Sequence, residues 1–285
     1  MKTILLGGGM VGQCYAQVLQ AQGHHIVAFC DHAPSDTLRA LAAELGASIH
    51  AAPGPWLAEA GLVVSAVFGT AALDLARAAL PHLQTGTLYL DMTTADPQAM
   101  RDAEALAHER GVRFVDVAIT GAVNLSGART PLLCAGAAAE EAARLLTACG
   151  APVQVVGERP GDAAELKLLR SIFTKGLEAL SVECLVTAER KGLRETLFRV
   201  LADIDQGSLR ETMESMVRTH IVHAGRRRNE VVEAQRQMAQ AGVPAIVLAG
   251  VQQRFEHTLA QQQATPYAGQ TTADALAWLG GPARP

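Results

Sequence analysis

A Gly-x-Gly-x-x-Gly pattern at residues 7–12 constrains the fold more than any other feature of the sequence. It directly follows the apolar run 3–6 and opens the alanine- and leucine-rich stretch 10–22. In this strand–turn–helix context the pattern is typical of a dinucleotide-binding βαβ unit. The pyrophosphate is expected on the N–H groups at the helix start, where the helix dipole favours anions. A glycine-rich turn without a ligand is the alternative interpretation. The expected cofactor-binding residues of this turn are Gly7, Gly9, Met10, Val11 and Gly12.

Asp31 follows the second expected strand, about 20 residues beyond the glycine turn. A carboxylate at this point accepts hydrogen bonds from the ribose hydroxyls of NAD and repels the 2′-phosphate of NADP. No Arg or Lys follows it before Arg39. The sequence therefore favours NAD over NADP as the cofactor. In the alternative interpretation, Asp31 only opens the turn at residues 32–34.

The first part of the chain alternates short strands with helices, which predicts βαβ units and a largely parallel sheet. Strands are expected at Thr3–Leu6, His25–Cys30, Leu62–Val67, Thr87–Asp91, Arg113–Val117, Leu132–Ala135 and Val153–Val156. Helices are expected at Met10–Gln22, Ser35–Leu45, Ala71–Leu80, Asp96–Arg110 and Ala138–Cys149. The pattern predicts an α/β Rossmann-type N-terminal domain over residues 1–158, with a mainly parallel sheet.

The pattern changes after Gly157. From Asp162, a suitable N-cap, a helical stretch runs to about residue 191, just before Gly192, a suitable C-cap. Further helices are expected at 194–202, 208–223, 226–241, 245–262 and 273–279. This pattern predicts an all-α C-terminal domain over residues 159–285, which begins with a long interdomain helix at about 162–191.

The composition excludes several classes of function. The 285 residues carry a formal net charge of −4 and only 4% are aromatic, which argues against nucleic-acid binding. The five cysteines are scattered, without a Cys-x-x-Cys pair or a Cys/His cluster, so neither a metal site nor a disulfide framework is expected. No signal peptide is recognisable, and no stretch reaches the ~20 apolar residues of a membrane span. We therefore expect a cytoplasmic protein without nucleic-acid or membrane partners.

Four segments of the chain, 7–12, 91–97, 116–122 and 161–167, follow the order of motifs in one known family. Through them the chain resembles the β-hydroxyacid dehydrogenase family, relatives of 6-phosphogluconate and 3-hydroxyisobutyrate dehydrogenases, and within it a divergent 6-phosphogluconate dehydrogenase-like branch. The second segment, Asp-Met-Thr-Thr-Ala-Asp-Pro, is similar to the family's D-x-S-T-x-x-P turn. The resemblance implies that this turn and the loop before it lie beside the cofactor. The residues concerned are Val67, Phe68 and Thr93.

The third segment is similar to the family's substrate motif. In that motif a Ser-Gly-Gly turn offers a hydroxyl and backbone N–H groups to a substrate carboxylate. Here Thr120 and Gly121 match, with Thr in place of Ser, whereas Ala122 departs from the pattern, as does the continuation 124–136. The resemblance implies that these three residues bind the substrate.

The fourth segment aligns Lys167 with the family's catalytic lysine, and Ser171 stands where the family usually has Asn. One helical turn keeps the two side chains on the same face. A lysine in a closed cleft serves as general acid or base if desolvation lowers its pKa towards neutrality. The nicotinamide cofactor carries the hydride. In the alternative interpretation, Lys167 is a solvated lysine on a helix surface.

A basic run at residues 226–228 lies ahead of Gly242-Val243-Pro244, which sets the register with a family segment that carries a Lys-Asp pair. The corresponding residues are Asn229 and Glu230. We expect Arg228 and Asn229 to contact the substrate, because arginine binds carboxylates through two parallel hydrogen bonds. A solvated basic helix end, or a cluster of charges at an interface, is the alternative.

Together these features predict an NAD(P)-dependent dehydrogenase that acts on the CH–OH group of a small β-hydroxy carboxylate, with Lys167 as general acid–base. The resemblance also implies a homodimer formed through the helical domain. An imine reductase of the same architecture is one alternative, against which Lys167 argues. A dinucleotide-binding protein without turnover is another, since Ser171 replaces the family's Asn and the segment after Thr120 is altered.

Overall fold

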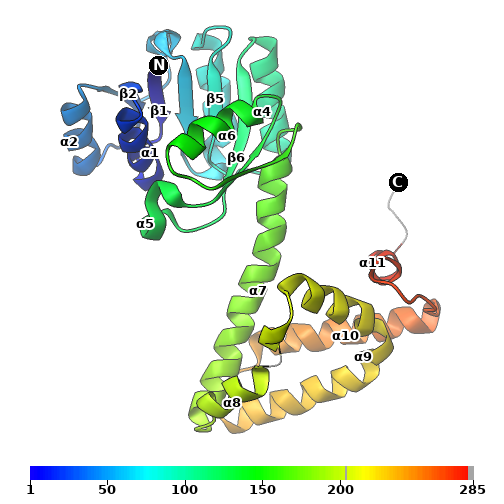
Figure 1. Cartoon of the computed structure of the whole chain (residues 1–285). Helices are drawn as coiled ribbons and strands as arrows, with labels where there is room; N and C mark the ends of the chain where they lie inside the picture. The colour runs from blue at the N-terminus through cyan, green and yellow to red at the C-terminus, as the bar shows by residue number, and fades with distance from the viewer. Residues whose placement is uncertain (203, 282–285) are drawn as a thin grey trace. The chain divides into compact units, whose positions relative to one another are not determined.

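The computed structural model describes residues 1–202 and 204–281, which belong to two compact units, Met1–Ile172 and Phe173–Pro285 (Figure 1). One helix, α7 (Asp162–Arg190), contributes to both units. The domain limit expected at residues 158/159 falls just before this helix, whereas the compact units divide within it.

The first unit is built on an eight-stranded sheet with the strand order β3-β2-β1-β4-β5-β6-β7-β8. The strands are β1 (Lys2–Leu6), β2 (His25–Cys30), β3 (Ser48–His50), β4 (Leu62–Ser65), β5 (Leu88–Asp91), β6 (Arg113–Ile119), β7 (Leu132–Ala135) and β8 (Val153–Gly157). All neighbouring strands are parallel except β6 and β7, which are antiparallel. The expected Rossmann-type domain with a mainly parallel sheet is confirmed.

Helices cover both faces of this sheet. They are α1 (Met10–Ala21), α2 (Asp36–Leu45), α3 (Ala72–Ala79), α4 (Pro97–Glu109), α5 (Val123–Ser126), α6 (Ala139–Ala148) and the first part of α7. α1, α2 and α6 pack on the face that presents Leu5 and Phe29. α3, α4 and the start of α7 pack on the face that presents Ile4 and Tyr89. Because successive strand residues point to opposite faces, two covered faces require strands that are apolar at most positions.

Two details of the sheet differ from the sequence-based expectation. β3 is not predicted from the sequence, because three residues are too few for an alternating pattern; it pairs with the end of β2 at the edge of the sheet. The strand expected at 62–67 ends at Ser65, after which the chain enters the loop that carries Phe68.

In the second unit, every regular element of the described residues is helical. These elements are the rest of α7, α8 (Arg194–Leu201), a 3₁₀ turn (Ile204–Gln206), α9 (Leu209–Gln240), α10 (Ile246–Ala264) and α11 (Thr272–Gly280). The expected helix-rich C-terminal region is confirmed. None of the described helices is long and apolar enough to cross a membrane.

The two helices expected at 208–223 and 226–241 are one helix, α9, so this prediction is wrong. Ser208 and Glu211 form a capping box at its start. Gly225 does not end it, because a glycine inside a helix costs only about 1 kcal/mol. A Cβ at Gly225 would lie 3.8 Å from Leu259 of α10, so the position packs against a neighbouring helix. Tertiary packing therefore outweighs the local glycine signal.

Candidate active site

The glycine turn between β1 and α1 leaves the start of α1 open. Gly7 has a φ of +102°, and a Cβ there would lie 2.6 Å from the carbonyl oxygen of Ala66, so glycine is required. A Cβ at Gly12 would lie 2.0 Å from the carbonyl oxygen of Gly7. At the N-cap, Gly9, no described atom lies within 4 Å of the Cβ position, and no described side chain caps the helix. These uncapped N–H groups form a cradle for an anion. The cradle consists of the backbone of Gly9, Met10 and Val11.

Asp31 stands at the end of β2 and is half-buried. Its Oδ2 accepts a hydrogen bond from the N–H of Gly8 at 2.9 Å, and its Oδ1 accepts one from the N–H of Ala33 at 2.9 Å. The residue thus both fixes the glycine turn and opens its own turn. Each carboxylate oxygen has a second lone pair, so these contacts leave acceptor capacity for ribose hydroxyls.

The turn after β5 is held by a buried carboxylate. Oδ1 of Asp91 accepts hydrogen bonds from the N–H of Thr93 at 3.0 Å and from its Oγ1 at 2.5 Å. Thr94, the next residue, has a φ of +54° and is the only described residue other than glycine with a positive φ. A β-branched residue in this region is strained, so the conformation depends on the contacts around it. The hydroxyl of Thr93, expected beside the cofactor, is turned towards Asp91.

A cavity of about 640 Å³ lies beside this turn. Phe68, which follows Val67 in the loop after β4, is 87% exposed at its rim. The size is within the range of small-molecule sites. The cavity lies at the carboxyl ends of β4 and β5, the edge where open α/β sheets bind ligands. It is lined by residues 68–70, Leu73, Asp74, 94–96 and Ala99.

Lys167 lies on α7 within the first unit and is half-buried. Its Nζ donates a hydrogen bond to Oγ1 of Thr94 at 2.8 Å. Burial lowers the pKa of Lys167, and the nearby carboxylate of Asp116 opposes this effect. Ser171 lies one turn further along, and its hydroxyl donates to the carbonyl oxygen of Lys167 at 3.0 Å. The contact with Thr94 is not foreseen from the sequence, because 73 residues separate the two partners.

Thr120, Gly121 and Ala122 lie at the end of β6. The hydroxyl of Thr120 donates to the carbonyl oxygen of Pro131 at 3.0 Å, which fixes the side chain against the start of β7. Gly121 and Ala122 are exposed. A Cβ at Gly121 would lie 2.9 Å from the methyl group of Thr130. The turn is therefore accessible to a ligand, with one lone pair of the Thr120 hydroxyl still available.

Arg228 and Asn229 lie on α9, in the second unit, so they do not belong to the same compact unit as Lys167. Nε of Arg228 is buried and has no hydrogen-bond partner among residues 1–202 and 204–281. Asn229 is exposed. The neighbouring Arg226 forms an ion pair with Glu230 at 2.7 Å.

The fold and the open glycine turn define a dinucleotide-binding oxidoreductase-type domain. Residues 2–157 match the NAD binding domain of 6-phosphogluconate dehydrogenase, and residues 188–258 match a domain of unknown function, DUF1932. The chain belongs to this 6-phosphogluconate dehydrogenase-like family. The resemblance inferred from the four sequence segments is thereby confirmed.

Three similar proteins span nearly the whole chain. An uncharacterised 28.5 kDa protein of Methanothermus fervidus is 25% identical over 257 residues, which cover 90% of this chain and 98% of that one. A solved protein of unknown function, described as structurally similar to 3-hydroxyacid dehydrogenases, is 29% identical with a TM-score of 0.62 and covers 97% and 100% of the two chains. The structure of a variant imine reductase from Myxococcus stipitatus in complex with NAD⁺ has a TM-score of 0.76 and covers 98% of this chain and 99% of that one. Its sequence is only 17% identical, so the similarity shows the fold alone.

Proposed function

We propose that the chain is an NAD(P)-dependent oxidoreductase that reversibly oxidises the hydroxyl group of a small β-hydroxy carboxylate. The hydrogen bond from Nζ of Lys167 to Oγ1 of Thr94 is the observation that carries this proposal. It directs an amine of lowered pKa to the turn that lines the cavity at the carboxyl edge of the sheet. A positioned amine beside a cavity, in a domain that also carries a dinucleotide cradle, has the parts required for hydride transfer coupled to proton transfer.

The residues present fit a dinucleotide. The cradle at Gly9 has the room and the N–H groups that a pyrophosphate requires, and the carboxylate of Asp31 suits the ribose hydroxyls. We favour NAD over NADP, because Asp31 would repel a 2′-phosphate. Phe68 and the turn with Thr93 would flank the nicotinamide end. When bound, the cofactor supplies the acceptor or donor of the hydride.

In this proposal, Nζ of Lys167 removes the hydroxyl proton of the substrate during oxidation and returns it to the carbonyl oxygen during reduction. Partial burial favours the neutral amine that accepts the proton. Thr94 holds the side chain of Lys167 in place. The hydroxyl of Ser171 bonds within α7, to the carbonyl oxygen of Lys167, and keeps a lone pair for the substrate. Thr120, with the N–H groups of Gly121 and Ala122, would bind the substrate carboxylate.

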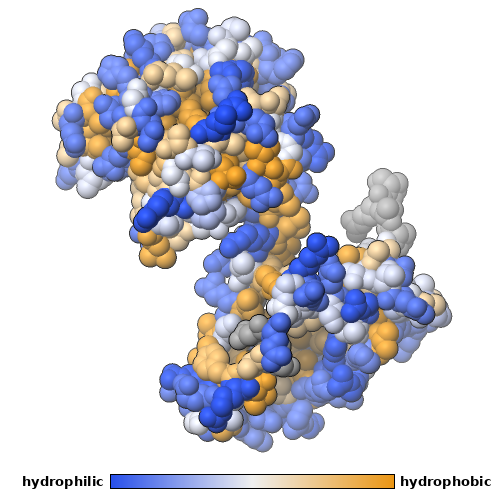
Figure 2. Space-filling view, in the orientation of Figure 1, coloured by the Kyte–Doolittle hydropathy of each residue, from blue (hydrophilic) through white to orange (hydrophobic). Residues whose placement is uncertain are grey.

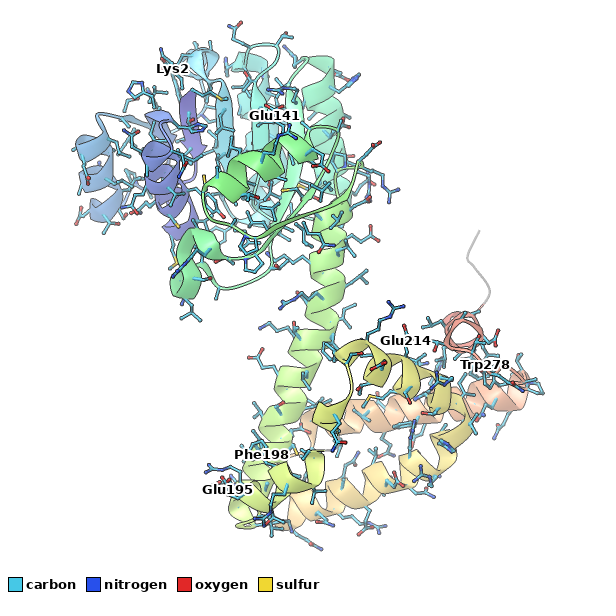
Figure 3. All side chains as sticks on the ribbon, viewed as in Figure 1. Lys2, Glu141, Glu195, Phe198, Glu214 and Trp278 are labelled. Carbon is cyan, nitrogen blue, oxygen red and sulfur yellow. The ribbon has the colours of Figure 1, made fainter. Side chains whose placement is uncertain are left out.

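We infer that residues 159–285 form the substrate and dimerisation domain and that a second copy of the chain covers its apolar surface. Phe198 of α8, labelled in Figure 3, is 51% exposed, and Ile246 at the start of α10 is 76% exposed. Figure 2 shows hydrophobic side chains at the surface of this unit around α8. A cavity of about 750 Å³ between α7, α8 and α9 has a mainly apolar lining that includes Leu180, Leu193, Leu197, Val200 and Met238. Exposed apolar surface of this kind marks an interface. Arg228 and Asn229, which also belong to this domain, would contact the substrate.

Light scattering during size exclusion tests the dimer. Val200→Glu is expected to convert a dimer into monomers, because a buried unpaired carboxylate in an interface is costly. Leu125→Glu, on an exposed apolar residue of the first unit, is the matched control and should leave the dimer intact. A wild-type monomer would refute the inference.

The proposed reaction is tested by fluorescence titration with NADH and NADPH, followed by an absorbance screen over hydroxy carboxylates and cyclic imines. Wild type is compared with Lys167→Ala and with Lys175→Ala, which removes an exposed lysine of the same helix. We expect turnover of a hydroxy carboxylate that depends on Lys167 and not on Lys175. Turnover of imines alone would favour an imine reductase, and cofactor binding with no turnover would favour a non-catalytic protein.

A further inference from the structure

Asp116 is a fully buried acid in the middle of β6. Its Oδ2 accepts hydrogen bonds from the N–H groups of Gly161 at 2.9 Å and of Ala164 at 3.0 Å. Both donors lie at the start of α7, where N–H groups have no partner within the helix. A carboxylate at this end also interacts favourably with the helix dipole. The N-terminus of the helix that carries Lys167 is therefore capped by a side chain of the sheet.

The start of α7 is also in close contact with the start of α4. Gly161 has a φ of +96°, and a Cβ there would lie 2.6 Å from the carbonyl oxygen of Pro97 and 2.9 Å from Nη1 of Arg101. Pro97 comes three residues after Thr94 in the chain. A displacement of α7 at Gly161 would therefore also displace the segment that carries Thr94.

Asp91 fixes the turn that contains Thr94, the hydrogen-bond partner of Lys167. It is paired in register with Asp116 across β5 and β6, so the two side chains point to the same face of the sheet. Asp91 binds the N–H and the hydroxyl of Thr93, which fixes the turn that contains Thr94. Asp91 thus fixes the turn that contains the acceptor, Thr94, and Asp116 fixes the start of the helix that carries the donor, Lys167.

We propose that Asp116 is a positioning residue for Lys167: by capping α7 from the sheet, it sets the place at which Nζ of Lys167 meets Oγ1 of Thr94. Lys167 follows Ala164 by three residues, so the cap determines its position along the helix axis to within about one turn. The proposal rests on the proposed function only in that Lys167 is the acid–base. The contacts themselves are independent of any substrate.

Asp116 acts on Lys167 through its charge as well as through the cap. Burial raises the pKa of Asp116 to about 6, so its carboxylate is charged above neutral pH. This charge raises the pKa of Lys167 and partly offsets the effect of burial. Two further carboxylates interact with Asp116. Asp162, which is ion-paired with Arg159 at 2.8 Å, raises the pKa of Asp116, and the charge of Asp116 raises the pKa of Asp91.

Two variants separate the cap from the charge. Asp116→Asn keeps a side-chain oxygen that accepts the two N–H bonds but has no charge. Asp116→Ala removes both. Glu183→Gln and Glu183→Ala are the matched controls, because Glu183 is a buried carboxylate that caps α10 through the N–H groups of Val247 and Leu248.

The experiment measures the pH dependence of Lys167 acetylation by limiting acetic anhydride between pH 7 and 10.5, read by peptide mass spectrometry, with Lys175 as internal reference. It requires no substrate, so a failure of the proposed reaction would not affect it. In Asp116→Asn we expect the pKa of Lys167 to fall by about one unit, since a nearby opposite charge shifts a pKa by roughly 1–3 units. The reactivity of Lys175 with acetic anhydride should be the same in every variant, and the Glu183 variants should leave the acetylation profile of Lys167 unchanged.

Amide hydrogen exchange of residues 161–168 reports the cap. We expect exchange to accelerate at least tenfold in Asp116→Ala and to stay close to wild type in Asp116→Asn. If Asp116→Ala does not fold, Asp116→Val, which fills the space in the sheet without offering an acceptor, tests the cap through the same exchange measurement. The proposal is overturned if hydrogen exchange of residues 161–168 stays at the wild-type rate in Asp116→Ala or Asp116→Val, or if Glu183→Ala alters Lys167 as much as the Asp116 variants do. An unchanged pKa of Lys167 in Asp116→Asn would refute the effect of the charge.

Discussion

Nζ of Lys167 and Oγ1 of Thr94 lie 2.8 Å apart, and Thr94, which accepts this hydrogen bond, has a φ of +54°. A strained residue of this kind costs about 1–3 kcal/mol and persists only where its surroundings determine it. Here the surroundings are the Asp91–Thr93 contacts on one side and the start of α7 on the other. The strain therefore coincides with the contact on which the proposed proton transfer depends.

Thr94→Val removes the hydroxyl and keeps the shape of the side chain. We expect kcat/KM for the substrate identified in the screen to fall about 10- to 100-fold, because Nζ of Lys167 loses its hydrogen-bond acceptor. Thr94→Ser keeps the hydroxyl and should stay close to wild type. Equal activity of the Val and Ser variants in steady-state kinetics would contradict a role for the hydroxyl.

Gly9→Ala and Gly12→Ala separate binding from folding. Gly9 has an extended φ of −70° and open space around its Cβ position, so alanine should leave the melting temperature unchanged. Its methyl group would occupy the anion cradle, and we expect the Kd for NADH to rise about tenfold or more. Gly12→Ala should instead lower the melting temperature, because its Cβ would meet the carbonyl oxygen of Gly7. Fluorescence titration and thermal unfolding of both variants check this pair; a reversed pattern would refute the cradle.

Asp31→Ala tests the choice of cofactor. Loss of a charged acceptor for ribose hydroxyls should weaken NADH binding about tenfold, while NADPH binding should become tighter because a repulsive charge is removed. Asp36→Ala, which removes an exposed carboxylate from the start of α2, is the control. An unchanged ratio of the two Kd values in Asp31→Ala would mean that this residue only shapes its own turn.

The stability of the protein should depend on the protonation of Asp91. Burial raises the pKa of Asp91 to about 6, above its value of about 4 in an unfolded chain. The folded state therefore binds this proton more tightly, and the resulting stability is fully present below about pH 4 and is lost as the pH rises through 6. Asp91→Asn keeps an acceptor for Thr93 and does not titrate.

Relative to wild type, the free energy of unfolding of Asp91→Asn should rise by up to about 3 kcal/mol between pH 4 and 7. Urea denaturation at several pH values measures this difference. Asp102→Asn, at an exposed position of α4, should show no such trend. A difference between Asp91→Asn and wild type that does not vary with pH would show that folding does not raise the pKa of Asp91.

The sequence predicts most of the first unit because the informative signals are local. The glycine turn, the apolar strands and the helix caps each lie within a few residues, so the sheet and its helices follow from them. β3 is not predicted, since three residues carry no periodicity. α9 is divided wrongly at Gly225, where packing against α10 overrides the preference of a single residue.

The sequence predicts the candidate site only in part. Lys167 and the glycine turn follow from motif spacing, but the partner of Lys167 does not, because the hydrogen bond joins residues far apart in the chain. A signal for Asp116 is present: it is an acid between Phe114, Val115 and Val117 in a strand buried on both faces. Such an acid requires a buried partner. The partner itself becomes evident only when α7 is placed on the sheet.

Threonine at position 94 lowers the thermal stability of the fold but provides the hydroxyl that the proposed reaction uses. Asparagine or glycine adopts a φ near +54° with less strain, so selection for a higher melting temperature would favour either residue there. Both replacements discard the hydroxyl that receives Nζ of Lys167. Substitutions intended to raise the melting temperature of this protein should therefore be made at positions other than 94.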